Sequence, residues 1–288
     1  MKAILKREAN AYFDSMTGYV FIAFLVAAVG IYFYLINLYG GYPYFGTTLN
    51  STLYIFMVAI PVLTMRSFAE EKRSKTDQLL LTSPVSATGI VMGKYLAMLY
   101  VYVFPVLLFC LCPVLIGLTG TAYYAADYAT IFTFFLMGAL YISIGMFISS
   151  LCDSQMIAFV STFVVLLVLY LWDTIVSFIP ASSVASFIGI LIISLLIAFF
   201  VFRMSKNWVA SCITGFVLML IASAVFAIDS ALFENLLPSV LKSFSVIGVM
   251  NNVAVYNVLD LRGIAMFLTM TVLLIFLTVQ MLQKRRWS

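Results

Sequence analysis

The sequence contains no histidine, and only 9% of its 288 residues are charged. Histidine is the commonest general base and metal ligand near neutral pH, so its absence disfavours catalytic chemistry and a metal site. A soluble domain carries roughly 25% charged residues, because its surface faces water. A chain with so little charge and 65% hydrophobic residues needs the lipid bilayer as its solvent. The composition therefore predicts an integral membrane protein. The distribution of its net charge of +4 indicates membrane topology and not nucleic-acid binding.

Cysteine is also scarce, and its spacing does not form a metal-binding or redox motif. The four cysteines are Cys110, Cys112, Cys152 and Cys212, and no C-x-x-C pair occurs among them. Cys110 and Cys112 point to different faces of a helix because they are two positions apart. We expect all four to act as small hydrophobic residues in a membrane core.

The chain lacks a phosphate-binding loop. Its Gly93-Lys94 pair is followed by Tyr95 where the motif G-x-x-x-x-G-K-[ST] needs serine or threonine, and Thr88 stands where the first glycine belongs. We therefore expect no ATP hydrolysis, no catalytic residue and no cofactor in this chain itself.

Long apolar runs take the place of these features. Crossing the hydrocarbon region needs about 20 apolar residues in a helix, since a helix satisfies its own backbone hydrogen bonds. The pattern predicts an all-α, polytopic transmembrane helical bundle with about eight spans in one domain, residues 1–288. The spans are expected at residues 18–38, 50–65, 95–118, 129–151, 156–178, 185–202, 208–228 and 264–282.

The basic residues test this arrangement. If the N-terminus is cytoplasmic, eight spans place both termini inside, and of the 15 basic residues only Lys242 and Arg262 fall outside. Such asymmetry is what the positive-inside rule requires. We expect a multi-pass protein of the cell membrane, with residues 229–262 forming an external segment that lies at or dips into the outer interface.

Residues 1–17 have the pattern of an amphipathic helix. A helix over this segment separates an apolar face from a polar one. The apolar face would carry Leu5, Ala9, Tyr12, Phe13 and Met16, and the polar face Lys2, Lys6, Asn10 and Asp14. The pattern predicts a helix in the cytoplasmic interface that leads into the first span. A plain charged leader is the alternative.

Charges within the expected spans are nearly absent. Asp173, next to Trp172 near the outer end of the fifth span, is the one candidate. It is either an interfacial residue or part of a translocation path. Transporters coupled to protons or sodium need groups that bind the coupling ion, so this scarcity disfavours them.

Residues 66–94 form the one sizeable cytoplasmic loop. Phe68 and Leu79–Leu81 give this charged segment an apolar component, and Pro84 is expected to end a first helix. Ser86 then caps a second helix that runs through Lys94 into the third span. A helix, turn and helix at the membrane surface can transmit force from a soluble partner, whereas a flexible loop cannot.

The residues of this loop resemble the ABC-2 class of ABC-transporter permeases, and most closely its gliding-motility-type (GldF-like) subgroup. The resemblance rests on Phe68, Glu70, Glu71, Lys72, Arg73, Thr76, Leu79–Leu81, Ser83–Ser86 and Gly93–Ala97, and at the far end on Asp260–Arg262 and Lys284–Trp287. Two departures stand out. The family usually has glycine before the threonine, where this chain has Lys75, and Leu-Glu where it has Asp77-Gln78. Family members commonly have six spans, so residues 185–202 and 208–228 look like an added pair.

The resemblance implies a permease subunit, paired with a second copy or a paralogue and driven by a separate ATPase that holds ATP and magnesium. It also implies an exporter in a bacterial plasma membrane, in contact with membrane lipid. The ATPase-coupling candidates are Phe68, Glu70, Glu71, Lys72, Arg73, Thr76, Pro84 and Ser86, and Asp173 is the translocation-path candidate. A transporter or channel without an ATPase is the alternative, and a membrane enzyme is a third, disfavoured reading.

Overall fold

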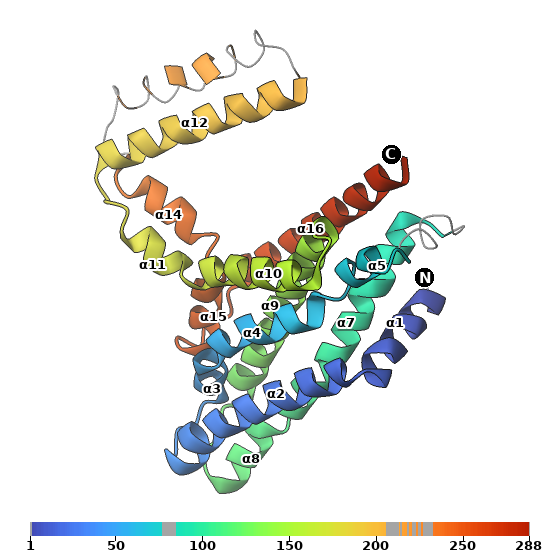
Figure 1. Ribbon diagram of the computed structural model, residues 1–288. Helices are drawn as coiled ribbons and strands as arrows, with labels where there is room; N and C mark the ends of the chain where they lie inside the picture. Colours follow the sequence, from blue (N-terminus) through green and yellow to red (C-terminus); the bar gives the residue numbers. More distant parts are fainter. Residues whose placement is uncertain are drawn as a thin grey trace. The chain divides into compact units, whose positions relative to one another are not determined.

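The computed structural model of the chain describes residues 2–76, 85–205 and 233–287, together with scattered positions between 213 and 226. Within these residues the secondary structure is helical and no strand occurs (Figure 1). This confirms the all-α prediction. Pro84 and most of the expected span 208–228 lie outside the described residues.

The chain divides into two compact units. The first comprises Met1–Tyr170 and Val246–Ser288, and the second Leu171–Ser245. In the first unit the helices are α1 (Lys2–Asp14), α2 (Met16–Phe33) with its π-helical extension η1 (Tyr34–Tyr39), α3 (Phe45–Ser51), α4 (Leu53–Thr64), α5 (Ala69–Arg73), α7 (Ala87–Phe109), α8 (Cys112–Thr119), α9 (Tyr124–Leu151), α10 (Gln155–Tyr170), α15 (Val246–Ala254) and α16 (Leu261–Trp287).

Within the described residues, five helical segments are long and apolar enough to cross a membrane. They are Met16–Tyr39, Leu53–Arg73, Ala87–Leu118, Tyr124–Leu151 and Leu261–Arg285. The count reaches six if the broken pair Leu236–Lys242 and Val246–Ala254 forms one span. These five match expected spans, while the total of eight and the cytoplasmic termini stay predictions. The second segment runs on to Arg73, beyond its expected end at residue 65.

The N-terminal helix differs in part from its expected face. Helix α1 packs against α7 and α2, and its Ala9 and Tyr12 are buried as the amphipathic pattern predicts. Met16 was expected on the same face but is 83% exposed. The reason is that α1 ends at Asp14 and a new helix starts at Met16, so the helical register does not continue across Ser15.

Helix α9 lies at the centre of the first unit, where it packs against α4, α7, α10, α15 and α16. Glycines allow two of these close approaches. A β-carbon on Gly138 would lie 2.5 Å from the Tyr102 ring of α7, and one on Gly145 would lie 2.2 Å from Thr64 Oγ1 of α4. Helices in a membrane associate through close packing of small residues, because lipid is as apolar as the side chains.

A cluster of polar residues lies where the loop after η1 meets α3 and the start of α9. Asp127, in the first turn of α9, is 1% exposed and accepts a hydrogen bond at 2.8 Å from the N–H of Phe45, where α3 begins. The Asn37 amide donates to the carbonyls of Tyr42 and Tyr44 at 2.8 and 3.1 Å. These contacts fix the short loop after η1. The expectation that Asp173 is the one charge within a span is wrong. The apolar helix begins at Tyr124, before the expected start at residue 129, and therefore includes Asp127.

The second unit contains α11 (Trp172–Ser177), α12 (Ser183–Ser205) and α14 (Leu236–Lys242). The Trp172 indole N–H donates to the carbonyl of Leu241 at 2.8 Å, which joins α11 to α14. Asp173 lies in the first turn of α11 and is partly exposed. The helix of the expected fifth span ends at Tyr170 and resumes at Trp172.

We expect Gly145→Ala to lower the stability of the protein by about 1 to 3 kcal/mol, because the new methyl group would displace Thr64 and separate α4 from α9. Gly30→Ala in α2 is the matched control, since its β-carbon meets no atom within 4 Å. It should be neutral or stabilising by up to about 1 kcal/mol, as alanine is the better helix former. Thermal unfolding in one detergent measures both. Equal stability of the two variants would contradict the close α4–α9 contact.

Candidate coupling site

Helix α5, Ala69–Arg73, is the short charged helix at the end of the second apolar segment and carries four of the coupling candidates singled out in the sequence. Its first turn holds Glu70 and Glu71 and its last turn Lys72 and Arg73, which complements the helix dipole. Five residues are too few for a stable isolated helix. The contacts of α5 with its neighbours must therefore hold it in place.

An ion cluster with the buried Lys94 at its centre and the exposed Arg7 at its edge joins α5 to α7 and α1. The Lys94 side chain of α7 is 2% exposed, and its Nζ lies 2.8 Å from Glu71 Oε1 and 3.2 Å from Glu8 Oε2. Arg7 completes the cluster, at 3.3 Å from Glu71 and 2.7 Å from Glu8. The Lys94 ammonium also lies 5.3 Å from the centre of the Phe68 ring, within range of a cation–π contact. Two acids and two bases thus balance in one site.

Close backbone packing places Lys94 there. Ser86 caps α7 as the sequence predicts, since its hydroxyl accepts the N–H of Gly89 at 3.2 Å. Gly93, next to Lys94, lets α1 approach, and a β-carbon on it would lie 2.9 Å from Ile4 Cγ2. The Lys94 ammonium can therefore reach Glu8 of α1.

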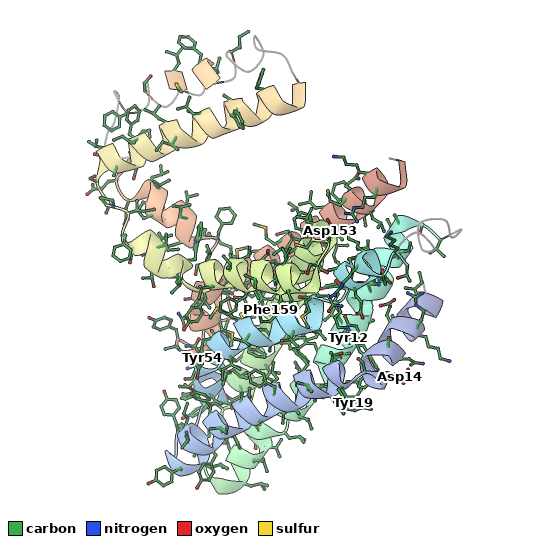
Figure 2. The ribbon with its side chains drawn as sticks, viewed as in Figure 1. Tyr12, Asp14, Tyr19, Tyr54, Asp153 and Phe159 are labelled. Carbon is green, nitrogen blue, oxygen red and sulfur yellow. The ribbon has the colours of Figure 1, made fainter. Side chains whose placement is uncertain are left out.

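A second ion pair lies beside this cluster and connects α5 to the start of α2. Arg66 forms a two-point contact with Glu70, at 2.6 and 3.0 Å, and donates to Thr17 Oγ1 at 3.3 Å. The Tyr12 hydroxyl donates to the carbonyl of Leu63 at 3.1 Å. Figure 2 labels Tyr12 among the side chains. Burial raises the pKa of Tyr12 well above its ordinary value, so this phenol stays a neutral donor. A cavity of about 50 Å³ lies next to this ion pair and has room for a few water molecules. It is lined by Glu8, Ala11, Tyr12, Ser15, Thr17, Arg66, Ser67 and Glu70.

The far end of α5 faces outward. Arg73, Ser74, Lys75 and Thr76 are all exposed. Lys75 has a left-handed backbone, with φ of 56°. The N–H of Thr76 donates to Glu71 O at 3.0 Å and that of Lys75 to Lys72 O at 3.1 Å, a pattern typical of a helix that ends on a left-handed residue. Glycine is the usual residue in this conformation, which gives a physical reason for the glycine expected from the resemblance.

The structure therefore separates the predicted site residues by orientation. Phe68, Glu71 and Lys72 face inward, Glu70 is partly exposed beside Arg66, and Arg73 and Thr76 face solvent. Ser86 is the cap of α7, Asp173 belongs to the second unit, and Pro84 lies outside the described residues.

Sequence reasoning missed the inward partners of α5, namely Glu8, Lys94 and Ser149. No local pattern marks them, because Lys94 is 23 residues from Glu71 and Ser149 is 81 residues from Phe68. In the part of the chain that the structure describes, no three histidine, cysteine or acidic side chains gather as a metal site would require.

The fold and the site define a polytopic helical membrane protein whose short helix α5 is held by the buried Lys94 and its acidic partners and presents an exposed end. A family model described as ABC-2 family transporter protein matches residues 8–189, which is more than half of the chain and runs from α1 into α12. The chain belongs to the ABC-2 transporter family. No curated protein and no solved structure gives a match.

We expect the two adjacent glutamates to differ in their effect on stability. Glu71→Gln leaves the buried Lys94 with one carboxylate in place of two, so it should cost about 2 kcal/mol or more. Glu70→Gln, the same change one residue earlier at a 42% exposed side chain, should cost less than about 1 kcal/mol. Thermal unfolding in detergent measures both, and an equal loss would contradict the buried network.

We expect Lys75→Gly to stabilise the end of α5 by about 1 kcal/mol, since a left-handed backbone is unfavourable for a residue with a β-carbon. Lys75→Ala removes the same charge and keeps the strained conformation, so it is the matched comparison. Unfolding temperature should rise for the glycine variant alone. A glycine variant no more stable than the alanine variant would show that strain at Lys75 is negligible.

Proposed function

We propose that this chain is the membrane permease subunit of an ABC transporter and that a separate ATPase docks on the exposed end of α5. We assign it to the gliding-motility-type (GldF-like) subgroup, as an exporter that works as a dimer with a second copy or a paralogue in a bacterial plasma membrane. The ATPase would hold the ATP and magnesium. In this arrangement residues 66–94 and both termini are cytoplasmic.

The observation that carries the proposal is the division of charge on α5. The inward charges, Glu71 and Lys72, are held by α1, α7 and α9, whereas Arg73 and Lys75 point to solvent from the same helix end. A held helix with a free basic edge suits a partner that presents acidic groups and delivers force. Complementary charge across such an interface sets partner choice and association rate.

The energy source is inferred from chemistry that the chain lacks. Its sequence has no phosphate-binding loop, and its buried Lys94 is neutralised within the protein by Glu8 and Glu71. Secondary transporters keep ionisable groups within the membrane to bind a coupling ion. Asp127, the buried carboxylate of α9, lies in the first turn of its helix and accepts the N–H of Phe45, which is a structural contact. These observations support an external ATPase over ion coupling. Asp173 remains our candidate for a residue of the translocation path.

We expect the double change Arg73→Glu with Lys75→Glu to weaken association with the cognate ATPase at least tenfold, because it places acidic groups where the partner meets basic ones. Lys242→Glu is the control, an exposed lysine that the charge pattern places on the other side of the membrane. It should leave association unchanged. Co-purification and a titration by light scattering or interferometry in detergent measure the affinity.

Tight binding by the double variant would contradict docking at this edge. Failure of the wild-type chain to bind any ATPase encoded beside it would contradict the proposed function itself and would favour a transporter or channel that works alone.

A further inference from the structure

Helix α5 receives its N-terminal cap from α9. The N–H groups of Phe68 and Ala69, at the start of α5, have no acceptor within so short a helix. The Ser149 hydroxyl of α9 accepts both at 3.2 Å, and it donates its own proton to Met65 O at 3.2 Å. Ser149 is fully buried, so water does not compete for these bonds.

Helix α9 receives its C-terminal cap from α5. The last carbonyls of a helix have no partner within it and carry the negative end of the dipole, so they attract a cation. The Lys72 ammonium donates to the carbonyls of Ser150 and Cys152, the latter at 3.0 Å. The Lys72 side chain is 7% exposed, so this is a buried contact.

The two caps form a joint between the start of α5 and the end of α9, at which the two helices move together. Moving α5 away from α9 would leave two buried N–H groups and a buried ammonium without partners, which is costly. Moving both together keeps every one of these bonds. Gly145, one helical turn before Ser149, adds the close α4–α9 contact next to the joint.

We infer that Ser149 and Lys72 are positioning residues that pass a displacement of the docked segment into α9. The inference rests on the proposed function, in which an ATPase moves α5. Because α9 packs against α7, α10, α15 and α16, a shift of α9 reaches the rest of the first unit. The Arg285–Asp153 contact of 3.4 Å links α16 to the same region, but Asp153 is 83% exposed and such pairs are weak. The caps of Ser149 and Lys72 therefore connect α5 to α9 through buried bonds, in addition to the buried Lys94–Glu71 contact with α7.

Hydrogen–deuterium exchange on the full chain bound to its ATPase tests this inference. In the wild type, a non-hydrolysable ATP analogue should change deuterium uptake in residues 65–76 and in residues 143–155. In the variant Ser149→Ala with Lys72→Met, the change should persist in residues 65–76 and be lost in residues 143–155. Lys72→Arg alone should behave as the wild type, because a guanidinium still donates to both carbonyls.

The controls separate a positioning role from general destabilisation. Lys6→Met with Ser239→Ala changes an exposed lysine and an exposed serine away from the joint and should preserve both responses. If the double variant does not fold, the single variant Ser149→Ala provides the test of the inference. It should raise basal exchange at Phe68 and Ala69 about fivefold to tenfold and at least halve the response in residues 143–155.

A folded variant without both caps that keeps the full response in residues 143–155 would overturn the inference. A wild-type complex in which the nucleotide does not change deuterium uptake in residues 143–155 would overturn it as well, while leaving the proposed function intact. Absence of any wild-type complex with an ATPase would instead contradict the proposed function.

Discussion

The ammonium group of Lys94 lies where water scarcely reaches it, and a buried charge is stable only when it is paired and hydrogen-bonded. Its partners are Glu71 of α5 and Glu8 of α1, so three segments that are distant in sequence must meet at this ion. Helix α5 is too short to persist without such contacts. The position of its exposed end, and with it the proposed ATPase contact, therefore depends on the neutralisation of Lys94.

The same helix is held from another side by α9, through the caps that Ser149 and Lys72 provide. Within the membrane, α9 itself is held by close contacts at Gly138 and Gly145, where packing replaces the hydrophobic effect as the cause of association. Buried polar bonds at the end of α9 and small residues along it thus hold one helix. This arrangement fixes the short charged segment against α9, as the proposed coupling role requires.

The features predicted from the sequence are those set by local composition. Five apolar segments, the helix at the N-terminus and the Ser86 cap depend on neighbouring residues, and the structure has them as expected. The features that were missed depend on contacts across the fold. Lys94 was predicted to lie on the helix that leads into the third span, but its ion partners were not predicted, because hydropathy carries no information about residues that are far apart in sequence. The left-handed backbone of Lys75 was not predicted, since lysine rarely adopts it, and the glycine that the resemblance expects there was its one sign in the sequence.

The most direct test of this account is a cryo-electron-microscopy structure of the chain with its ATPase in nucleotide-free and ATP-bound states. We predict that residues 73–76 contact the ATPase and that α5 and α9 shift together between the two states. The Lys94–Glu71 and Lys72–Cys152 contacts should persist in both. An ATPase seated elsewhere, or an α5 that separates from α9 when nucleotide binds, would contradict it.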